Sequence, residues 1–243
     1  MGFVEISEGA ARIVFTDRHG GVSAAPYDTA NLGHLTDDAD DRVEENRRRV
    51  GVAVGGAVAE PARWFRMRQV HGAGVVVAER PSDGGGAPDA DAAVTTETGR
   101  PLVVLTADCA PVALVSEHAV GAVHAGWRGL VGGVIEAAVD VQRSVDDTPV
   151  RAVLGPCIHP ERYAFGTAQL DAVVSRLGPA VQGRTIGGEP ALDLRAGVRA
   201  ALTAVGVTDL TDVDVCTAAS PHHFSYRRDG VTGRQAMIVV REP

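Results

Sequence analysis

The sequence predicts an α+β fold, a single compact domain over residues 1–243 in which mixed β-sheets pack against α-helices. Short β-branched runs come in clusters and do not alternate strictly with helical patterns, which argues against a doubly wound parallel sheet. The chain also has no internal repeat and no linker-like segment. Its one low-complexity stretch, residues 81–88, is short and typical of a surface loop.

Each expected element follows from its local pattern. Apolar runs rich in Val, Ile, Leu and Thr predict strands at Ala11–Phe15, Trp64–Val70, Gly74–Ala78, Leu102–Thr106, Val112–Ser116, Ala119–His124, Val150–Leu154, Val213–Cys216 and Ala236–Val240. Helical periodicity predicts four helices, at Asp38–Val50, Leu130–Arg143, Gly166–Leu177 and Leu194–Val205. The first of these has acidic residues in its opening turn and Glu–Arg pairs at i,i+4 spacing, which support a helix.

The composition excludes several chemistries. All 23 basic residues are Arg, so the chain has no side-chain amine for a Schiff base, a pyridoxal phosphate aldimine or a phosphate-binding P-loop. Arg stays protonated and acts as a fixed cation. The net charge of −8 argues against nonspecific nucleic-acid binding. Hydrophobic residues at 45% and charged residues at 22% are typical of a globular protein.

The first residues and the cysteines predict the compartment. Charged residues interrupt the first twenty positions, so no signal peptide fits, and no apolar run is long enough to span a membrane. Three widely spaced cysteines do not form a disulfide framework. We expect a cytoplasmic protein with free thiols that acts on small molecules, with no membrane, nucleic-acid or obligate protein partner.

The segment from residue 102 to residue 129 contains two apolar runs that flank Glu117-His118. If they form an antiparallel hairpin centred there, Cys109 faces Gly126 and Pro111 faces His124. Cys109 and His124 would then be diagonal neighbours on one face, roughly 7–8 Å apart at the backbone, and both could reach one metal ion.

A third ligand is available at His71, in the Gly-rich bend Arg68-Gln-Val-His-Gly-Ala-Gly74. Two His and one Cys with an open fourth position describe a catalytic zinc site that activates water. Two other interpretations stay open. Cys109 could be a thiolate nucleophile with His124 as base and Asp108 as orienting acid. The Cys and His could also be ordinary core residues.

Arginines in glycine-rich loops are candidates for anion binding, because the guanidinium binds phosphate or carboxylate in a bidentate manner. Arg18 lies in Thr16-Asp-Arg-His-Gly-Gly-Val-Ser23 and Arg228 in Phe224-Ser-Tyr-Arg-Arg-Asp-Gly230. The alternative is a solvated loop charge. Further ligand candidates with less favourable spacing are Cys157, His159, Cys216, His222 and His223.

An ordered set of motifs resembles the YfiH/laccase-domain family, also called the multicopper polyphenol oxidase or peptidoglycan editing factor family. The resemblance covers nearly the whole chain. It rests on Thr16-Asp-Arg-His-Gly-Gly-Val-Ser23, Asn31-Leu-Gly33, Asn46-Arg47, Gln69-Val-His-Gly72, Thr106-Ala-Asp-Cys-Ala-Pro111, His124-Ala-Gly-Trp-Arg-Gly129, Gly155-Pro-Cys157, Tyr163 and Phe224-Ser-Tyr-Arg-Arg-Asp-Gly-Val-Thr-Gly-Arg234.

The resemblance implies a single-domain α+β protein in which His71, Cys109 and His124 bind zinc and are catalytic. It implies phosphorolysis of purine nucleosides such as adenosine, inosine and guanosine, with phosphate as co-substrate. Cleavage of methylthioadenosine and deamination of adenosine are also implied. Arg18 and Arg228 then become candidates for phosphate or ribose contacts.

Three alternatives to this function remain. A cysteine hydrolase or amidase that edits peptidoglycan precursors follows from one family name, and a copper-dependent polyphenol oxidase from another. The third alternative is a non-catalytic zinc- or nucleoside-binding protein. Eight His and three Met are few for the several centres of a multicopper oxidase, although copper could replace zinc at the single site.

Overall fold

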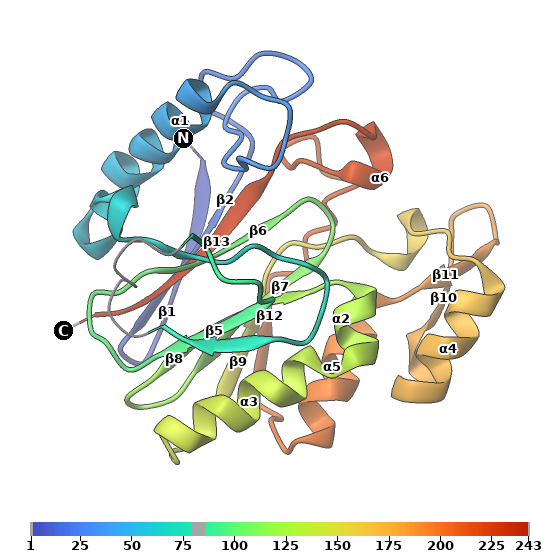
Figure 1. Cartoon of the computed structure of the whole chain (residues 1–243). Helices are drawn as coiled ribbons and strands as arrows, with labels where there is room; N and C mark the ends of the chain where they lie inside the picture. The colour runs from blue at the N-terminus through green and yellow to red at the C-terminus, as the bar shows by residue number, and fades with distance from the viewer. Residues whose placement is uncertain (1, 79–85, 243) are drawn as a thin grey trace.

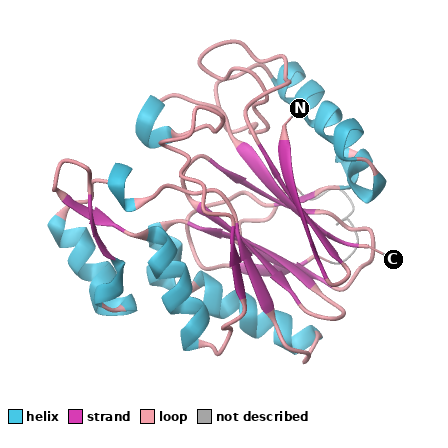
Figure 2. Ribbon diagram, turned by 180° about the vertical axis from the view of Figure 1, so that it is seen from behind, coloured by secondary structure: helices cyan, strands magenta, loops and turns pink. Residues whose placement is uncertain are grey.

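Two β-sheets lie face to face at the centre of the molecule, and helices cover the outer face of each sheet (Figure 1). The computed structural model describes residues 2–78 and 86–242, so residues 81–85 of the expected surface loop lie outside the described part. The view from behind shows the same order of helix, sheet, sheet and helix (Figure 2). This single α+β domain confirms the predicted fold class.

The first sheet has five strands and is mostly antiparallel; only its last pair is parallel. Its order across the sheet is β1 (Phe3–Glu8), β2 (Ala11–Thr16), β13 (Gln235–Arg241), β6 (Leu102–Thr106) and β3 (Phe65–Arg66). The carboxyl-terminal strand β13 therefore lies in the middle of this sheet, between β2 and β6.

The second sheet has six strands and is mixed, with parallel pairs at both edges. Its order is β12 (Leu210–Asp212), β9 (Arg151–Leu154), β7 (Ala110–Val115), β8 (Val120–Ala125), β5 (Ala92–Thr95) and β4 (Val75–Val77). A separate two-stranded ribbon consists of β10 (Gln182–Arg184) and β11 (Pro190–Leu192).

α1 (Asp40–Val54) packs on the outer face of the five-stranded sheet. α2 (Trp127–Gly132), α3 (Val134–Val145) and α5 (Leu194–Ala204) pack on the six-stranded sheet. α4 (Thr167–Leu177) lies beside the β10–β11 ribbon, and the short α6 (Tyr226–Asp229) lies away from both helix layers (Figure 1). Short 3₁₀ turns, η1 to η4, lie at Gly56–Ala59, Pro61–Arg63, Pro160–Arg162 and Pro179–Val181. None of the helices in the described ranges is long and apolar enough to cross a membrane.

Alternation along the strands explains the layers. On β2, Ile13 and Phe15 point into the core between the sheets, whereas Val14 packs in the outer core with Val50 of α1. On the other side, Ile135 of α3 belongs to the core between the six-stranded sheet and its helices. Burial of each such side chain stabilises the fold by about 1.5–3 kcal/mol relative to its exposure.

One predicted helix is wrong in its continuity. The segment Leu130–Arg143 was expected to be a single helix, but α2 ends at Gly132 and α3 begins at Val134. Gly133 between them has φ of 84°, a left-handed conformation that glycine adopts without steric cost. The chain therefore turns at Gly133, inside the segment that was expected to form one helix.

Two predicted strands are wrong in their extent. The Trp64–Val70 run forms a strand only at Phe65–Arg66; Arg68 then bridges to Asp89, and the side chain of Gln69 takes the place of main-chain pairing with Leu105. Its amide donates to Leu105 O at 2.8 Å and accepts from Leu105 N at 2.9 Å. The Val213–Cys216 run forms no strand, and Asp214 within it has φ of 57°. The only strand-like pairing of this run among the described residues is an isolated parallel bridge between residues 157 and 216.

Five observed strands were not expected from the sequence: β1, β5, β10, β11 and β12. β1 is an edge strand in which no position is fully buried and Val4, Glu5 and Ser7 are exposed, so its apolar residues do not alternate with its polar ones. β5 has two alanines among its four residues, although all four are buried, and alanine is a poor strand signal. The omission of β5 matters, because the residue before it belongs to the functional site.

Candidate functional site

The three side chains expected to share a metal meet where the chain crosses between the sheets. His71 lies on the crossing from β3 to β4, Cys109 on the crossing from β6 to β7, and His124 on β8. Their ligand atoms all lie within 4.8 Å of one another. Cys109 Sγ is 3.9 Å from His71 Nε2, and the two imidazole rings lie 4.8 Å apart, edge to face.

The hairpin register places two of these ligands. Pro111 is the Cα partner of His124 in the β7–β8 pair, as expected from a reversal at Glu117-His118. Cys109 precedes β7 by one residue and lies on the same side of the hairpin as His124. The predicted hairpin and its convergence of Cys and His are therefore confirmed.

Gly126 makes the close approach possible. A Cβ atom at this position would lie 3.2 Å from Cys109 Sγ and 3.0 Å from His71 Cδ2, which is tighter than ordinary contacts. Glycine follows β8 here and leads directly into α2, so the backbone lies against the cluster.

Asp91, immediately before β5, is a site residue that the sequence interpretation missed. Its carboxylate is fully buried and accepts hydrogen bonds from His124 Nδ1 at 2.8 Å and from the backbone N–H of His71 at 2.9 Å. Its other oxygen accepts from Gly72 N at 2.7 Å and Val70 N at 3.2 Å. Hydrogen bonds and the charge of His124 outweigh burial and hold the pKa of this carboxyl below its usual value.

This carboxylate orients both histidines. Because Nδ1 of His124 contacts Asp91, Nε2 is the nitrogen left for the cluster. The backbone bonds fix the bend at His71, whose φ of 59° is unusual for a residue with a side chain. A carboxylate behind a ligating histidine fixes ring orientation and raises ligand basicity. Sequence periodicity could not identify Asp91, because it is a single Asp before an alanine-rich run.

The electrostatics of the cluster favour the thiolate form of Cys109 and the protonated form of His124. Burial raises the pKa of Cys109, but the charge of His124 and hydrogen bonds from both histidines outweigh burial and lower it to about 6. Burial lowers the pKa of His124, but the Cys109 thiolate and Asp91 raise it to about 9. A stabilised thiolate is the form in which cysteine binds metal or attacks an electrophile.

These three residues fit a transition metal. Tetrahedral zinc with Zn–S of about 2.3 Å and Zn–N of about 2.1 Å places S and N roughly 3.6 Å apart, close to the observed 3.9 Å. One thiolate and two imidazoles suit zinc or copper, and a carboxylate supports one of the imidazoles. Within residues 2–78 and 86–242, this is the one group of three such ligands.

Asp108 does not act as the acid of a catalytic triad in this geometry. Its carboxylate accepts from Thr217 Oγ1 at 2.6 Å and from the backbone N–H of Arg227 at 2.7 Å. Its backbone has φ of 107°, so the chain turns sharply just before Cys109. Asp108 therefore ties α6 to the cluster, and Asp91 is the carboxylate that contacts His124.

Aromatic side chains lie beside the cluster. Phe165 packs edge to face on both Trp127 and Tyr163, with ring centroids 5.4 Å and 5.3 Å apart. The guanidinium of Arg227 lies 4.7 Å from the centre of the Tyr163 ring. Burial and the nearby Cys109 thiolate raise the pKa of Tyr163 to about 12, so its hydroxyl stays protonated. This surface combines flat apolar rings with cations.

The structure places Arg18 among groups that already bind it. Its Nε donates to Asp28 O at 2.8 Å, and its Nη2 lies 3.3 Å from Asp28 Oδ2. Its guanidinium stacks 4.8 Å from the Phe224 ring, and Nη1 is 3.9 Å from Asp229 Oδ2. The bidentate edge of Arg18 therefore faces Asp28.

Arg228 is also occupied by partners within the protein. Its Nε and Nη2 both contact the Asp229 carboxylate at 2.7 Å, and Nη2 also donates to His223 O at 2.7 Å. Its Nη1 donates to Thr217 O and Ser220 O at 3.1 and 2.7 Å. These bonds hold together the loop from residue 217 to residue 229.

The other ligand candidates lie apart from the cluster. Cys157 and Cys216 are partners across an isolated bridge, and burial raises the pKa of Cys157 well above its ordinary value. The backbone N–H of His159 contacts Cys216 Sγ at 3.4 Å. His222 Nδ1 lies 3.0 Å from His19 Nε2. Neither set joins a third ligand among the described residues.

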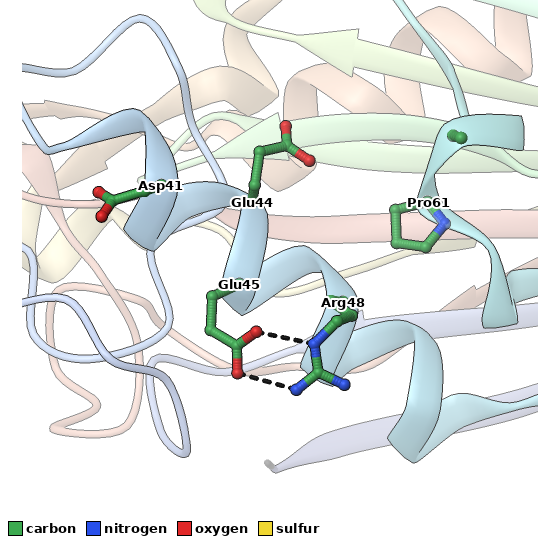
Figure 3. A pocket seen from close by; sticks show the side chains of 6 residues that line it. Asp41, Glu44, Glu45, Arg48 and Pro61 are labelled. Atoms are coloured by element: carbon green, nitrogen blue, oxygen red, sulfur yellow. Dashed lines mark hydrogen bonds and ion pairs between the residues drawn. The ribbon is translucent and has the colours of Figure 1, made fainter.

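A surface pocket lies elsewhere, between α1 and the turn at Pro61–Arg63 (Figure 3). Glu45 and Arg48 form a bidentate ion pair on its floor, with bonds of 2.7 and 2.9 Å. Its remaining lining residues are Asp41, Glu44, Pro61 and Ala62. None of the predicted site residues lines it, so this pocket has no link to the His71–Cys109–His124 cluster.

Residues 12–242 match the model of a protein family described as multi-copper polyphenol oxidoreductase laccase. The chain belongs to this laccase-domain family. The family is also represented by YlmD of Geobacillus stearothermophilus, whose crystal structure superposes with a TM-score of 0.88 at 30% identity over 99% of each chain. A Neisseria meningitidis protein of the DUF152 family gives a TM-score of 0.87 at 32% identity, also over 99% of each chain. The predicted resemblance is confirmed.

Curated relatives in the family carry an enzyme name. A purine nucleoside phosphorylase of Streptomyces coelicolor is 44% identical over 233 residues, which are 94% of this chain and 95% of that protein. Purine nucleoside phosphorylase YfiH of Shigella flexneri is 37% identical over 91% of this chain and 90% of that protein. The family name points to copper chemistry and the relatives' names to nucleoside cleavage.

The positions of the methionines and of the metal-ligand groups can be compared with the copper oxidase named by the family model. Met67 and Met237 belong to the core between the sheets, so neither is an axial ligand at the cluster. A multicopper oxidase needs further metal centres beside a His₂Cys site. Residues 2–78 and 86–242 contain only one group of three ligands. The described part of the chain therefore lacks the ligand sets of a multicopper oxidase.

Proposed function

We propose that this protein is a zinc-dependent purine nucleoside phosphorylase of the cytoplasm. Its substrates would be adenosine, inosine, guanosine and methylthioadenosine, with phosphate as co-substrate. The observation that carries the proposal is the His71–Cys109–His124 cluster, supported by the buried carboxylate of Asp91. The cluster occurs in a chain whose curated relatives are named purine nucleoside phosphorylases.

Phosphorolysis breaks the bond between the sugar C1′ and the purine nitrogen, while a phosphate oxygen bonds to C1′. The bonding electrons leave with the purine, and the sugar has oxocarbenium character. The reaction therefore needs an anion site and stabilisation of charge on the leaving base, but no amine. This agrees with a chain that contains no lysine.

His71, Cys109 and His124 would hold the zinc ion through Nε2, Sγ and Nε2, respectively. When bound there, zinc supplies a Lewis acid with an open coordination position. The protein keeps these donors oriented. Asp91 accepts a hydrogen bond from Nδ1–H of His124, and it accepts another from the backbone N–H of His71, which fixes the bend there. Copper is an alternative metal for the same donors.

The aromatic group beside the cluster suits a purine. Trp127, Tyr163 and Phe165 are partly buried and offer ring faces and edges for the base. The protonated hydroxyl of Tyr163 is able to donate a hydrogen bond to a purine nitrogen. These contacts would exclude water on one side of the reacting bond.

Adenosine deamination is part of the proposal as a side activity. It replaces the amino group at C6 with oxygen and requires an activated water, for which the same cluster is the natural site. Arg18 and Arg228 stay candidates for ribose contacts, which each would make by exchanging a present partner.

The deciding experiment is incubation of zinc-loaded protein with adenosine, with and without phosphate. Phosphate-dependent release of adenine and a sugar phosphate is the expected result, and hydrolysis without phosphate would contradict it. Formation of inosine reports deamination separately. No turnover of any purine nucleoside would contradict the phosphorylase and leave the cysteine hydrolase, the polyphenol oxidase and the zinc- or nucleoside-binding protein as alternatives.

A second function is favoured by the position of Cys109, whose Sγ lies against the imidazoles of His71 and His124; the two histidines lower the pKa of its thiol to about 6. Such a thiolate suits a cysteine hydrolase or amidase that edits peptidoglycan precursors. Amide cleavage of a muropeptide by metal-free protein, with an acyl adduct on Cys109 seen by mass spectrometry, would favour this function over phosphorolysis. The proposed phosphorylase instead loses zinc and activity together in Cys109→Ser.

A further inference from the structure

Arg234 lies at the edge of the sheets where the cluster forms. It directly precedes β13, and the first residue of that strand, Gln235, is the Cα partner of Thr106 at the end of β6. The chain continues from Thr106 through residues 107 and 108 to Cys109. Arg234, which precedes Gln235, therefore lies next to the connection that carries Cys109. Burial lowers the pKa of Arg234, and the charges of Cys109 and Asp108 oppose that shift.

The backbone and stem of Arg234 are fixed. Its N–H donates to Asn31 Oδ1 at 2.9 Å, and its carbonyl accepts from Leu32 N at 3.0 Å. A Cβ at Gly33 would lie 2.8 Å from Arg234 Cγ, so the absence of a side chain there leaves room for the stem. The family motif Asn31-Leu-Gly33 thus positions this arginine.

The guanidinium of Arg234 leaves its bidentate edge without an acceptor. Nη1 donates to Thr232 O at 2.8 Å and to Gly233 O at 2.9 Å. Nε and Nη2 have no acceptor among residues 2–78 and 86–242, and no carboxylate of that part lies within 4.0 Å of the group. This differs from Arg18 and Arg228, whose Nε/Nη2 edges face Asp28 and Asp229.

Arg227 presents a second cation from α6. Asp108 holds its backbone N–H, and Asp108 is the residue before Cys109. Its side chain stacks on Tyr163, and Nη1 donates to Ala164 O at 3.1 Å. Its guanidinium also interacts with the Tyr163 hydroxyl, so its polar partners here are Tyr163 and Ala164.

We propose that Arg234 forms the binding site for the inorganic phosphate co-substrate next to the His71–Cys109–His124 cluster, with Arg227 of α6 as a further cation of the site. This inference rests on the proposed function and names the residues that serve it. A tetrahedral oxyanion accepts two parallel N–H bonds from the Nε/Nη2 edge of Arg234, and the partly buried position of Arg234 strengthens them. Arg18 and Arg228 keep their roles in fixing the surrounding loops.

The test uses the zinc-loaded protein and its Arg234→Gln, Arg234→Lys and Arg227→Gln variants. Loss of one charge-assisted contact raises KM for phosphate by about 10- to 100-fold, with KM for adenosine within about twofold. Arg234→Lys keeps the charge without the paired donors and gives an intermediate KM for phosphate. Arg143→Gln is the matched control, because Arg143 is exposed in the last turn of α3 and its replacement removes the same charge.

Calorimetric titration with inorganic phosphate alone separates the two proposals. Wild-type protein that binds phosphate, while Arg234→Gln does not, supports the subsite even if no nucleoside is cleaved. Phosphate-dependent adenine release with an unchanged KM for phosphate in folded Arg234→Gln and Arg234→Lys overturns the subsite and leaves the proposed function intact. Wild-type protein that neither binds phosphate nor needs it for cleavage overturns both. Melting temperatures show which variants are folded.

Discussion

The buried carboxylate of Asp91 lies 2.8 Å from Nδ1 of His124, and the same oxygen lies 2.9 Å from the backbone nitrogen of His71. One side chain thus sets the ring orientation of one candidate ligand and the main-chain bend of another. His71 lies on the connection from β3 to β4 and His124 on β8, and Asp91 joins these two distant parts of the chain.

Asp91→Asn therefore lowers affinity for zinc by about 10- to 100-fold, the usual effect of losing a carboxylate behind a ligating histidine. The amide retains the size of the side chain but loses the charge that orients the imidazole. Competition with a chromogenic chelator measures the affinity. Asp89→Asn is the control, because Asp89 is exposed and pairs with Arg68. Equal affinity in both variants would contradict the role of Asp91.

Gly126→Ala disturbs the cluster by contact alone. The added methyl meets Cys109 Sγ at 3.2 Å and His71 Cδ2 at 3.0 Å, so at least one ligand has to move. We expect weaker zinc binding and lower turnover. Gly132→Ala is the comparison, because its methyl meets only Ala73 Cβ, at 3.5 Å, in a helix. Denaturant titration should show that Gly132→Ala stabilises the protein by about 0.4–1 kcal/mol, and activity assays should show no loss.

In metal-free protein, the thiol of Cys109 loses its proton at a lower pH than an ordinary thiol does. Because its pKa is about 6, roughly 90% is thiolate at pH 7, whereas an ordinary thiol is almost wholly protonated. The rate of alkylation by iodoacetamide should rise as pH increases through 6 and level off above 7. Peptide mapping should show no reaction at Cys157, whose thiol is buried with a raised pKa. Alkylation of Cys109 that rises only above pH 8 would refute the thiolate.

Asp146 stabilises the turn of the β7–β8 hairpin. Its carboxylate accepts from His118 N at 2.6 Å and from Thr148 Oγ1 at 2.8 Å, and Thr148 Oγ1 accepts from Glu117 N at 2.9 Å. Burial raises the pKa of Asp146, but hydrogen bonds from Ser116, His118 and Thr148 outweigh it and hold the pKa well below its usual value. The reversal at residues 117 and 118 therefore depends on a residue beyond the hairpin.

Asp146→Asn should lower the free energy of unfolding by about 1–3 kcal/mol at pH 7. A depressed folded-state pKa contributes stability above the unfolded value near 4, and this contribution is lost as pH falls below it. The difference between wild type and variant, measured by urea denaturation, should thus shrink from pH 7 to pH 3. A constant or growing difference would show that the charge of Asp146 has no such role.

The fold class and the candidate ligands could be predicted because both depend on local pattern. Period-2 runs marked the central strands, and the symmetry of the hairpin around Glu117-His118 brought Cys109 and His124 to one face. His71 was recognisable from its Gly-rich bend. None of these inferences required knowledge of how the two sheets pack.

The missed features depend on tertiary contacts. Asp91 acquires its role from three backbone N–H groups of a loop about twenty residues earlier, which no periodicity reveals. The arginines were ranked by their flanking glycines, but their hydrogen-bond partners decide which guanidinium is available for an anion. Arg18 faces Asp28, whereas the Nε/Nη2 edge of Arg234 has no acceptor among the described residues. The strand at Phe65–Arg66 is likewise short because of long-range contacts: Arg68 bridges to Asp89, and the amide of Gln69 bonds to Leu105.

The positions of the ligands on the chain have a consequence for the whole domain. His71 and Cys109 lie on the two connections that pass from the five-stranded sheet to the six-stranded sheet, and His124 belongs to the second sheet. An ion held by all three therefore fastens the sheets to each other, and separation of the sheets has to release it. Metal binding and global unfolding then form a single linked equilibrium, in which the heat resistance of the protein reports the free concentration of its metal.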